Sequence, residues 1–447
     1  MGRDSIWRLL LRFSGPSILS MMVLSSYNIV DAIFIGRLGP EALAALTIAF
    51  PLMMVFIAVG LGTGVGAASL ISRRLGAEDY EGANRAASVT ITLSILIGVL
   101  MTIITLSNME ALLRLFGASD SVLSLARSYM SILASFAIIN IFAVVIGNIV
   151  RAEGNPILAS AAMIVAALVN IALDPILIFG LGPIPAMGVA GAAIATVIGR
   201  SVGGLILIIY LVSGKTSYHF RLGYFLPNLK ILVEIYRVGI ASITRMIAGS
   251  VTLVLANRIA ASFGVIPIAV LGVLFRSASF IFMPCVGIGQ GILPLIGYNF
   301  GAKQNKRVGE VVIKAGLAAF IWSALCLVVA ILLPTQVMSI FNTETQFLVE
   351  ATRALRIFSL AFFGIGVQMI LSFFFQGIGK GLPALVLASA RQVIFLLPSL
   401  LILPPIFGLT GLWAAYPLTD AFALVLTLLW TGIEFRRLGI RFRLRYS

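Results

Sequence analysis

Two acidic residues lie where an acid is costly, inside long apolar stretches of the sequence. Asp174 is in the apolar run 157–180, and Asp31 is in an earlier run, with Tyr27 four residues before it. Asn170 precedes Asp174 by four residues, so the two share a face if the run is helical. A carboxylate near the middle of a membrane span costs about 2.5–3.5 kcal/mol on insertion scales and usually marks an ion or proton pathway. These acids are therefore the first candidates for chemistry.

The two acids could hold a cation in either of two ways. Two carboxylates that face each other in an apolar setting can share a proton. With amide and hydroxyl oxygens beside them they can instead hold Na⁺, a hard cation that takes oxygen ligands. The candidate partners are Tyr27, Asn148, Asn170 and Thr196. The alternative is a structural role, in which each Asp caps a kinked helix or pairs with a buried base such as Arg200.

Composition indicates an all-α integral membrane protein. The 447 residues are 60% hydrophobic and only 11% charged, whereas soluble domains carry about 25% charge. Apolar runs of about 20 residues recur along the chain, and each predicts a transmembrane helix. We expect about 12 such spans. No nucleophile–base pair, metal cluster or nucleotide-binding loop is evident, so the sequence does not favour an enzyme or a cofactor.

The net charge of +15 is placed in a way that argues against nucleic-acid binding. Most Lys and Arg residues lie in alternate loops and at the two ends of the chain. This asymmetry follows the positive-inside rule and predicts a multi-pass protein of the cell membrane with both termini in the cytoplasm. The basic tail 436–445 either rests against anionic lipid headgroups or serves as a topology signal only.

The second half of the chain repeats the first. The glycine series Gly60, Gly62 and Gly64 recurs as Gly287, Gly289 and Gly291, at an offset of roughly 225 residues. The two halves therefore have the same orientation, and we expect two pseudo-symmetric six-helix bundles, residues 1–222 and 223–447. The glycines suit close helix packing with a possible hinge.

The repeat also acts as an internal control for the acids. When the halves are aligned, Asp31 falls on Leu255 and Asp174 falls on Leu397. Residues found in one half only should carry a function that only that half has. The second half instead holds interior charges that could bind an anionic headgroup or pair with one another: Arg245, Arg276, Arg391 and Asp420.

Several of these segments together resemble the multidrug and toxic compound extrusion (MATE) transporters. The resemblance is to the prokaryotic DinF-like branch, related to the DNA-damage-inducible and staphylococcal drug exporters, and it covers nearly the whole chain. The segments that carry it are Tyr27 to Gly36, the glycine-rich second span, Arg151 to Pro156, Asn170 to Pro175 and Gly188 to Thr196.

The resemblance implies two six-helix lobes around a central cavity, and antiport of organic, often cationic and amphipathic compounds against H⁺ or Na⁺. It implies a cation site in the first lobe, possible for Na⁺, at Asp31, Asn170, Asp174 and Thr196, with Tyr27 and Asn148 nearby. It also assigns Pro16 to the bending of the first span. Some relatives carry an acidic site in the seventh span, where this chain has Leu255 and Arg245.

On this basis we expect a multidrug efflux transporter that works as a monomer among membrane lipids. Two alternatives stay open. One is a lipid-linked sugar flippase of the same superfamily, which would use the arginines of the second half for pyrophosphate. The other is a membrane scaffold without transport.

Overall fold

Helices make up nearly all of the computed structural model, which describes residues 1–440. The end of the basic tail, residues 441–447, lies outside the described part. The first half of the chain forms α1 (Ile6–Gly36), α2 (Pro40–Gly76), α3 (Tyr80–Ser107), α4 (Met109–Leu115), α5 (Asp120–Ser135), α6 (Ala137–Glu153), α7 (Pro156–Phe179), α8 (Val189–Val212) and the short 3₁₀ helix η1 (Leu222–Phe225).

The second half follows the same plan. Its elements are α9 (Leu229–Ser262), α10 (Val265–Gly301), α11 (Asn305–Leu332), α12 (Pro334–Ser339), α13 (Thr345–Phe358), the 3₁₀ turn η2 (Ser359–Ala361), α14 (Phe362–Gly377), α15 (Gly381–Ser389), the π-helix η3 (Ala390–Leu396) and α16 (Leu397–Arg437).

The described helices account for the predicted spans. Within residues 1–440, ten helices are long and apolar enough to cross a bilayer, and the bent pair α5–α6 can form one more. The longest of the ten, Gly381–Arg437, has 57 residues, whereas one crossing needs about 20. Gly408 has non-helical backbone angles within it and divides it into two helices. The result is the twelve-span, all-helical architecture that the sequence predicts.

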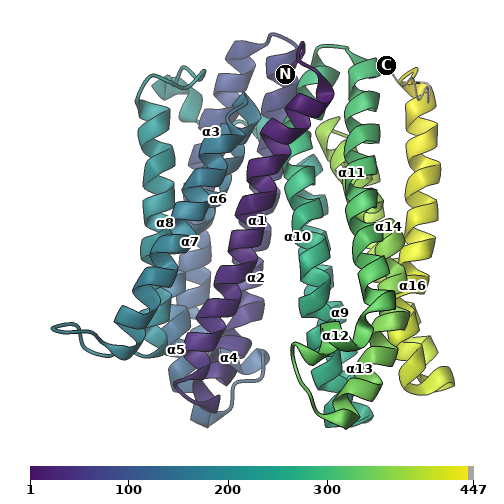
Figure 1. Cartoon of the computed structure of the whole chain (residues 1–447). Helices are drawn as coiled ribbons and strands as arrows, with labels where there is room; N and C mark the ends of the chain where they lie inside the picture. Colours follow the sequence, from purple (N-terminus) through teal and green to yellow (C-terminus); the bar gives the residue numbers. More distant parts are fainter. Residues whose placement is uncertain (441–447) are drawn as a thin grey trace. The chain divides into compact units, whose positions relative to one another are not determined.

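The chain divides into two compact units, and in each the long helices run side by side (Figure 1). The N-unit is Leu19–Ile243, and the C-unit is Met1–Ile18 together with the chain from Thr244 onward. Two helices are therefore shared. The first turns of α1 belong to the C-unit, and the first turns of α9 belong to the N-unit.

The repeated glycines pack closely against the first turns of α1 and α9. In the N-unit, a Cβ atom at Gly66 of α2 would collide with the backbone oxygen of Ile235, and one at Gly62 would meet Ile243 of α9. In the C-unit, a Cβ atom at Gly287 of α10 would collide with the backbone of Ile18 of α1. Small residues allow helix backbones to approach this closely in a membrane. The predicted close packing is thus a repeated contact between a glycine-rich helix and the start of a helix from the opposite half of the sequence.

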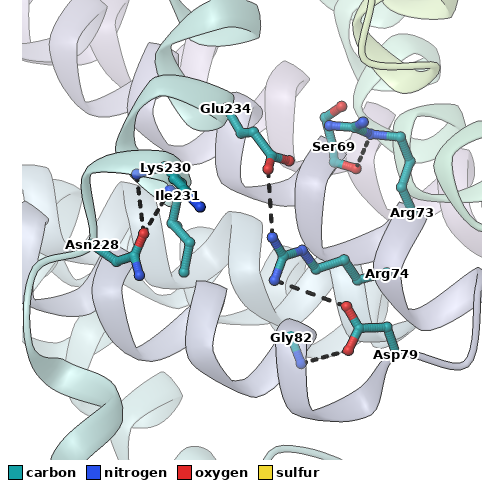
Figure 2. A network of polar contacts seen from close by, with 9 residues as sticks. All are labelled: Ser69, Arg73, Arg74, Asp79, Gly82, Asn228, Lys230, Ile231 and Glu234. Atoms are coloured by element: carbon teal, nitrogen blue, oxygen red, sulfur yellow. Dashed lines mark hydrogen bonds and ion pairs between the residues drawn. The ribbon is translucent and has the colours of Figure 1, made fainter.

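Polar contacts fasten the start of α9 to the end of α2 within the N-unit (Figure 2). Arg74 lies 3.6 Å from Glu234 of α9 and 3.9 Å from Asp79 in the loop after α2. The Asn228 side chain accepts hydrogen bonds from two backbone amides in the first turn of α9. Exposed ion pairs contribute about 0–1 kcal/mol each. These ion pairs therefore add little to the attachment.

We predict that Gly66→Ala lowers the melting temperature of the purified protein. Its new methyl group would meet a backbone oxygen, which cannot move cheaply, and overpacking of this kind costs about 1–3 kcal/mol. The measurement is thermal unfolding in detergent. Gly316→Ala is the matched control, because nothing lies within 4 Å of a Cβ atom at Gly316 in α11. An equal or higher melting temperature for Gly66→Ala would contradict the proposed contact.

Candidate cation site

Close packing of α7 on α8 brings three of the predicted residues together. A Cβ atom at Gly199 of α8 would collide with the Ala166 carbonyl of α7, so the two backbones run nearly in contact. Asn170 of α7 donates hydrogen bonds from its amide nitrogen to Thr196 Oγ1 of α8 (3.3 Å) and to Asp174 Oδ1 (3.5 Å). All three side chains are almost completely buried. Asn170 therefore links the acid to the hydroxyl.

The second acid, Asp31, lies on α1 in the same unit. Asp31 is only 7% exposed, and the next turns of α1 pack into the N-unit through Ile35, which is fully buried. The Phe34 ring meets the Phe179 ring at the end of α7 with a centroid distance of 6.2 Å. Asp31 is close enough to Asp174 for the two carboxylates to interact electrostatically. The structure thus places both predicted acids in one unit and in each other's field.

Several oxygens of this cluster have no hydrogen-bond partner among the described residues. They are Asp31 Oδ1, Asp174 Oδ2 and Asn170 Oδ1, all buried. Pro175, which follows Asp174, has no N–H to donate to the carbonyl of Ile171 one turn earlier. Unsatisfied buried oxygens are costly in native structures and need an explanation. A bound proton or Na⁺ would satisfy them.

The types of ligand atom around the acids also indicate which kind of ion could bind there. Within residues 1–440, no group of three or more His, Cys, Asp and Glu side chains could hold a metal ion. The cluster offers carboxylate, amide and hydroxyl oxygens. Such a set suits a hard monovalent cation or a proton rather than a transition metal.

The other predicted residues occupy different positions. Tyr27 is buried on α1 and interacts electrostatically with Tyr129. Asn148 is also buried, but its amide donates to the Val144 carbonyl one turn earlier in α6 (2.9 Å) and lies against Gly64 of α2. The structure thus gives Asn148 a packing partner of its own and shows no hydrogen bond from it to either acid.

Pro16 lies inside α1, in the part of that helix that belongs to the C-unit. The helix continues through it, although proline removes a helical hydrogen bond. The division between the two units falls just beyond, after Ile18. Pro16 is therefore a weak point at the place where α1 leaves one unit and enters the other.

Sequence reasoning missed Tyr129, which interacts with the acids, and Asn140, which is the partner of Arg200. Tyr129 of α5 is 2% exposed and interacts electrostatically with Asp31, Asp174 and Arg200. Arg200 of α8 donates to Asn140 of α6 at 2.7 Å. Polar residues at helical spacing in apolar segments are a signal that could have drawn attention to Tyr129 and Asn140, but that signal does not say which helices they face.

Paired helical repeats that cross a membrane, with acids buried inside one of them, define a membrane transport protein. A sequence model of the MatE family matches residues 16–176 and again residues 241–401. The chain belongs to the MatE family of transporters. The two matches also confirm the internal repeat.

Relatives and solved structures agree with this assignment. The chain is 30% identical to the multidrug export protein MepA of Staphylococcus haemolyticus, over 92% of this chain and 90% of that protein. It is 27% identical to MepA of Staphylococcus aureus over the same shares. Its structure is similar to a MOP superfamily transporter from Pyrococcus furiosus, with a TM-score of 0.92, 30% identity and 98% coverage of both chains. A multidrug resistance MATE family transporter in an outward-facing conformation also has a TM-score of 0.92, with 30% identity and coverage of 98% of this chain and 97% of that one.

Proposed function

We propose that this protein exports organic, often cationic and amphipathic compounds across the cell membrane in exchange for H⁺ or Na⁺. The relatives named as multidrug exporters supply the type of activity. The observation that carries the coupling is the buried cluster of Asp31, Asn170, Asp174 and Thr196, with its unsatisfied oxygens. An ion gradient is the energy source, since the glycine-rich stretch of α2 is continuous helix rather than a phosphate-binding loop.

The proposed cycle begins with uptake of a cation by the acid pair. With both carboxylates ionised, the cluster is negatively charged and attracts either a cation or a cationic compound. Binding of H⁺ or Na⁺ removes part of that charge and satisfies the free oxygens. It then lets α1 bend near Pro16, reshapes the interior of the N-unit and lowers its affinity for the compound.

The driving energy is adequate for export. One pH unit of gradient contributes about 1.4 kcal/mol per proton, and a potential of 100 mV contributes about 2.3 kcal/mol per elementary charge. Either ion could supply this energy, so the energy alone does not distinguish H⁺ from Na⁺. Four oxygen-bearing side chains favour Na⁺ as much as H⁺, and the two are separated by the experiment below.

The flippase alternative is less well supported by the positions of the arginines. A pyrophosphate site needs several free bases close together. Arg391 is already paired with Asp420, at 2.5 and 3.2 Å, and Arg276 is exposed. A scaffold without transport gives no reason for two acids buried in one unit.

We further propose that both termini face the cytoplasm, because the basic loops and ends of the sequence alternate with loops that are poor in Lys and Arg. We propose that the protein acts as a monomer, with its apolar surface in contact with membrane lipids. Asn148 and Tyr27 remain proposed members of the cation site, with Asn148 in a supporting position on α6.

Replacing either acid should abolish coupled export. Asp31→Asn and Asp174→Asn each keep the size of the side chain but remove the charge that a cation neutralises. The measurement is efflux of ethidium from proteoliposomes, with a pH gradient or a Na⁺ gradient imposed separately. The control is Asp120→Asn, which changes an acid whose side chain is 87% exposed on α5 and should leave export unchanged. Full export by either buried-acid variant would refute the assignment.

The two asparagines should differ in their effect on export. Asn170→Ala removes the amide that links Asp174 to Thr196, and losing a group that orients a ligand costs about 10–100-fold in affinity or activity. Asn148→Ala removes a hydrogen bond to the backbone of its own helix and should change the ion dependence of export much less. The ion concentration that gives half-maximal export is measured for both variants. Equal shifts would place Asn148 in the site alongside Asn170.

A further inference from the structure

The C-unit contains a cavity that belongs to no function assigned above. Its volume is about 320 Å³, and residues of α9, α10, α13, η2, α14, α15, η3 and α16 line it. Pockets for small molecules have volumes of about 300–1,000 Å³ and combine apolar walls with a few polar groups. Here the aromatic part of the wall includes Phe275, Phe282, Phe358, Phe362 and Tyr416.

The ionised side chains of the cavity do not balance. Arg391 and Asp420 form a bidentate pair with N–O distances of 2.5 and 3.2 Å, so together they are neutral. Arg245 also lines the cavity, and within residues 1–440 no salt bridge reaches it. Its guanidinium lies 5.7 Å from the centroid of the Phe373 ring and also interacts with the like charge of Arg391. Among the described residues, the cavity therefore has one positive charge without an acidic partner.

The backbone that carries two of the polar lining residues is a π-helix. Arg391 and Gln392 lie in η3, a seven-residue π-helix between α15 and α16. Segments of π-helix are rare and often occur at functional sites. Gln392 accepts a hydrogen bond from Thr252 of α9 at 3.1 Å, and both residues line the cavity. Thr252 and Gln392 thus add polar groups to a wall that also carries aromatic rings.

Aligning the two halves of the sequence shows that this cavity and the cation site carry opposite charge. When Gly191 is aligned with Gly411, Thr196 falls on Tyr416 and Arg200 falls on Asp420. Both of the latter residues line the cavity. At the positions of the two acids the C-unit has leucines, and its free charge is the guanidinium of Arg245. The equivalent region of the second repeat therefore attracts anions where the first attracts cations.

We propose that this cavity binds the anionic group of an aromatic or apolar amphiphile, with Arg245 as its charge partner and the phenylalanine rings around its body. Arginine suits this role because its planar fork can bond a carboxylate or phosphate through two parallel hydrogen bonds. The proposal adds a ligand class to the proposed function. Binding is measured without any ion gradient. The binding proposal can therefore fail while coupled export is confirmed, and coupled export can fail while binding is confirmed.

The test compares two ligands that share a ring system and a similar shape but differ in charge. Binding of 1-naphthoate and of the neutral 1-naphthamide is measured by calorimetry with the full-length protein in phosphatidylcholine nanodiscs. We expect the carboxylate to bind about tenfold more tightly, because its hydrogen bonds are charge-assisted. Arg245→Gln should remove that preference and leave naphthamide binding unchanged, which also shows that the variant is folded. Arg276→Gln, which changes an exposed arginine of α10, should keep the preference.

Two further measurements complete the test. If Arg245→Gln binds neither ligand, Arg245→Lys is measured, and it must still prefer the carboxylate because it keeps the charge. In nanodiscs that contain phosphatidylglycerol, weaker naphthoate binding by the wild type but not by Arg245→Gln would identify a lipid headgroup as a source of the anion. Equal binding of the two ligands to the wild type, a preference that survives Arg245→Gln, or no preference in Arg245→Lys would overturn the proposal.

Discussion

A charge inside an apolar bilayer is costly unless something pairs with it, and paired interior charges occur in both units. Arg391 meets Asp420, and Arg200 meets the amide of Asn140. The Asp31–Asp174 pair is different, because the two acids interact as like charges within one unit and several of their oxygens have no hydrogen-bond partner among the described residues. In the proposed function, a bound H⁺ or Na⁺ offsets that cost.

The scaffold around these charges is a repeated design. Each unit is completed by the first turns of a helix that continues into the other unit, α1 in one case and α9 in the other. Glycines of α2 and α10 make both contacts possible by removing the side chains that would keep the backbones apart. The repeat supplies the architecture, and the divergence between its copies supplies the separate chemistry of the two halves. A change of shape in α1 therefore concerns both units, since the helix belongs to both.

The sequence predicted much of this. Apolar runs, glycine series and the matched halves were sufficient for the spans and the repeat, because membrane helices must be long and apolar. Asn170 and Asp174 were predicted to share a face because local spacing on one helix decides it. The exchange of the ends of α1 and α9 was not predictable, since a glycine indicates a close neighbour without naming it. The neighbours of Tyr129 and Asn148 likewise depend on packing between helices that are distant in sequence.

The most direct test of the central claim counts the cations that the transported compound displaces. Ethidium is added to the purified protein in weakly buffered detergent, and released protons are followed with a pH-sensitive dye, while a parallel sample loaded with radioactive Na⁺ reports sodium release. The account predicts release of one of these ions from the wild type and none from a variant that carries both Asp31→Asn and Asp174→Asn. The same release from the double variant would contradict it.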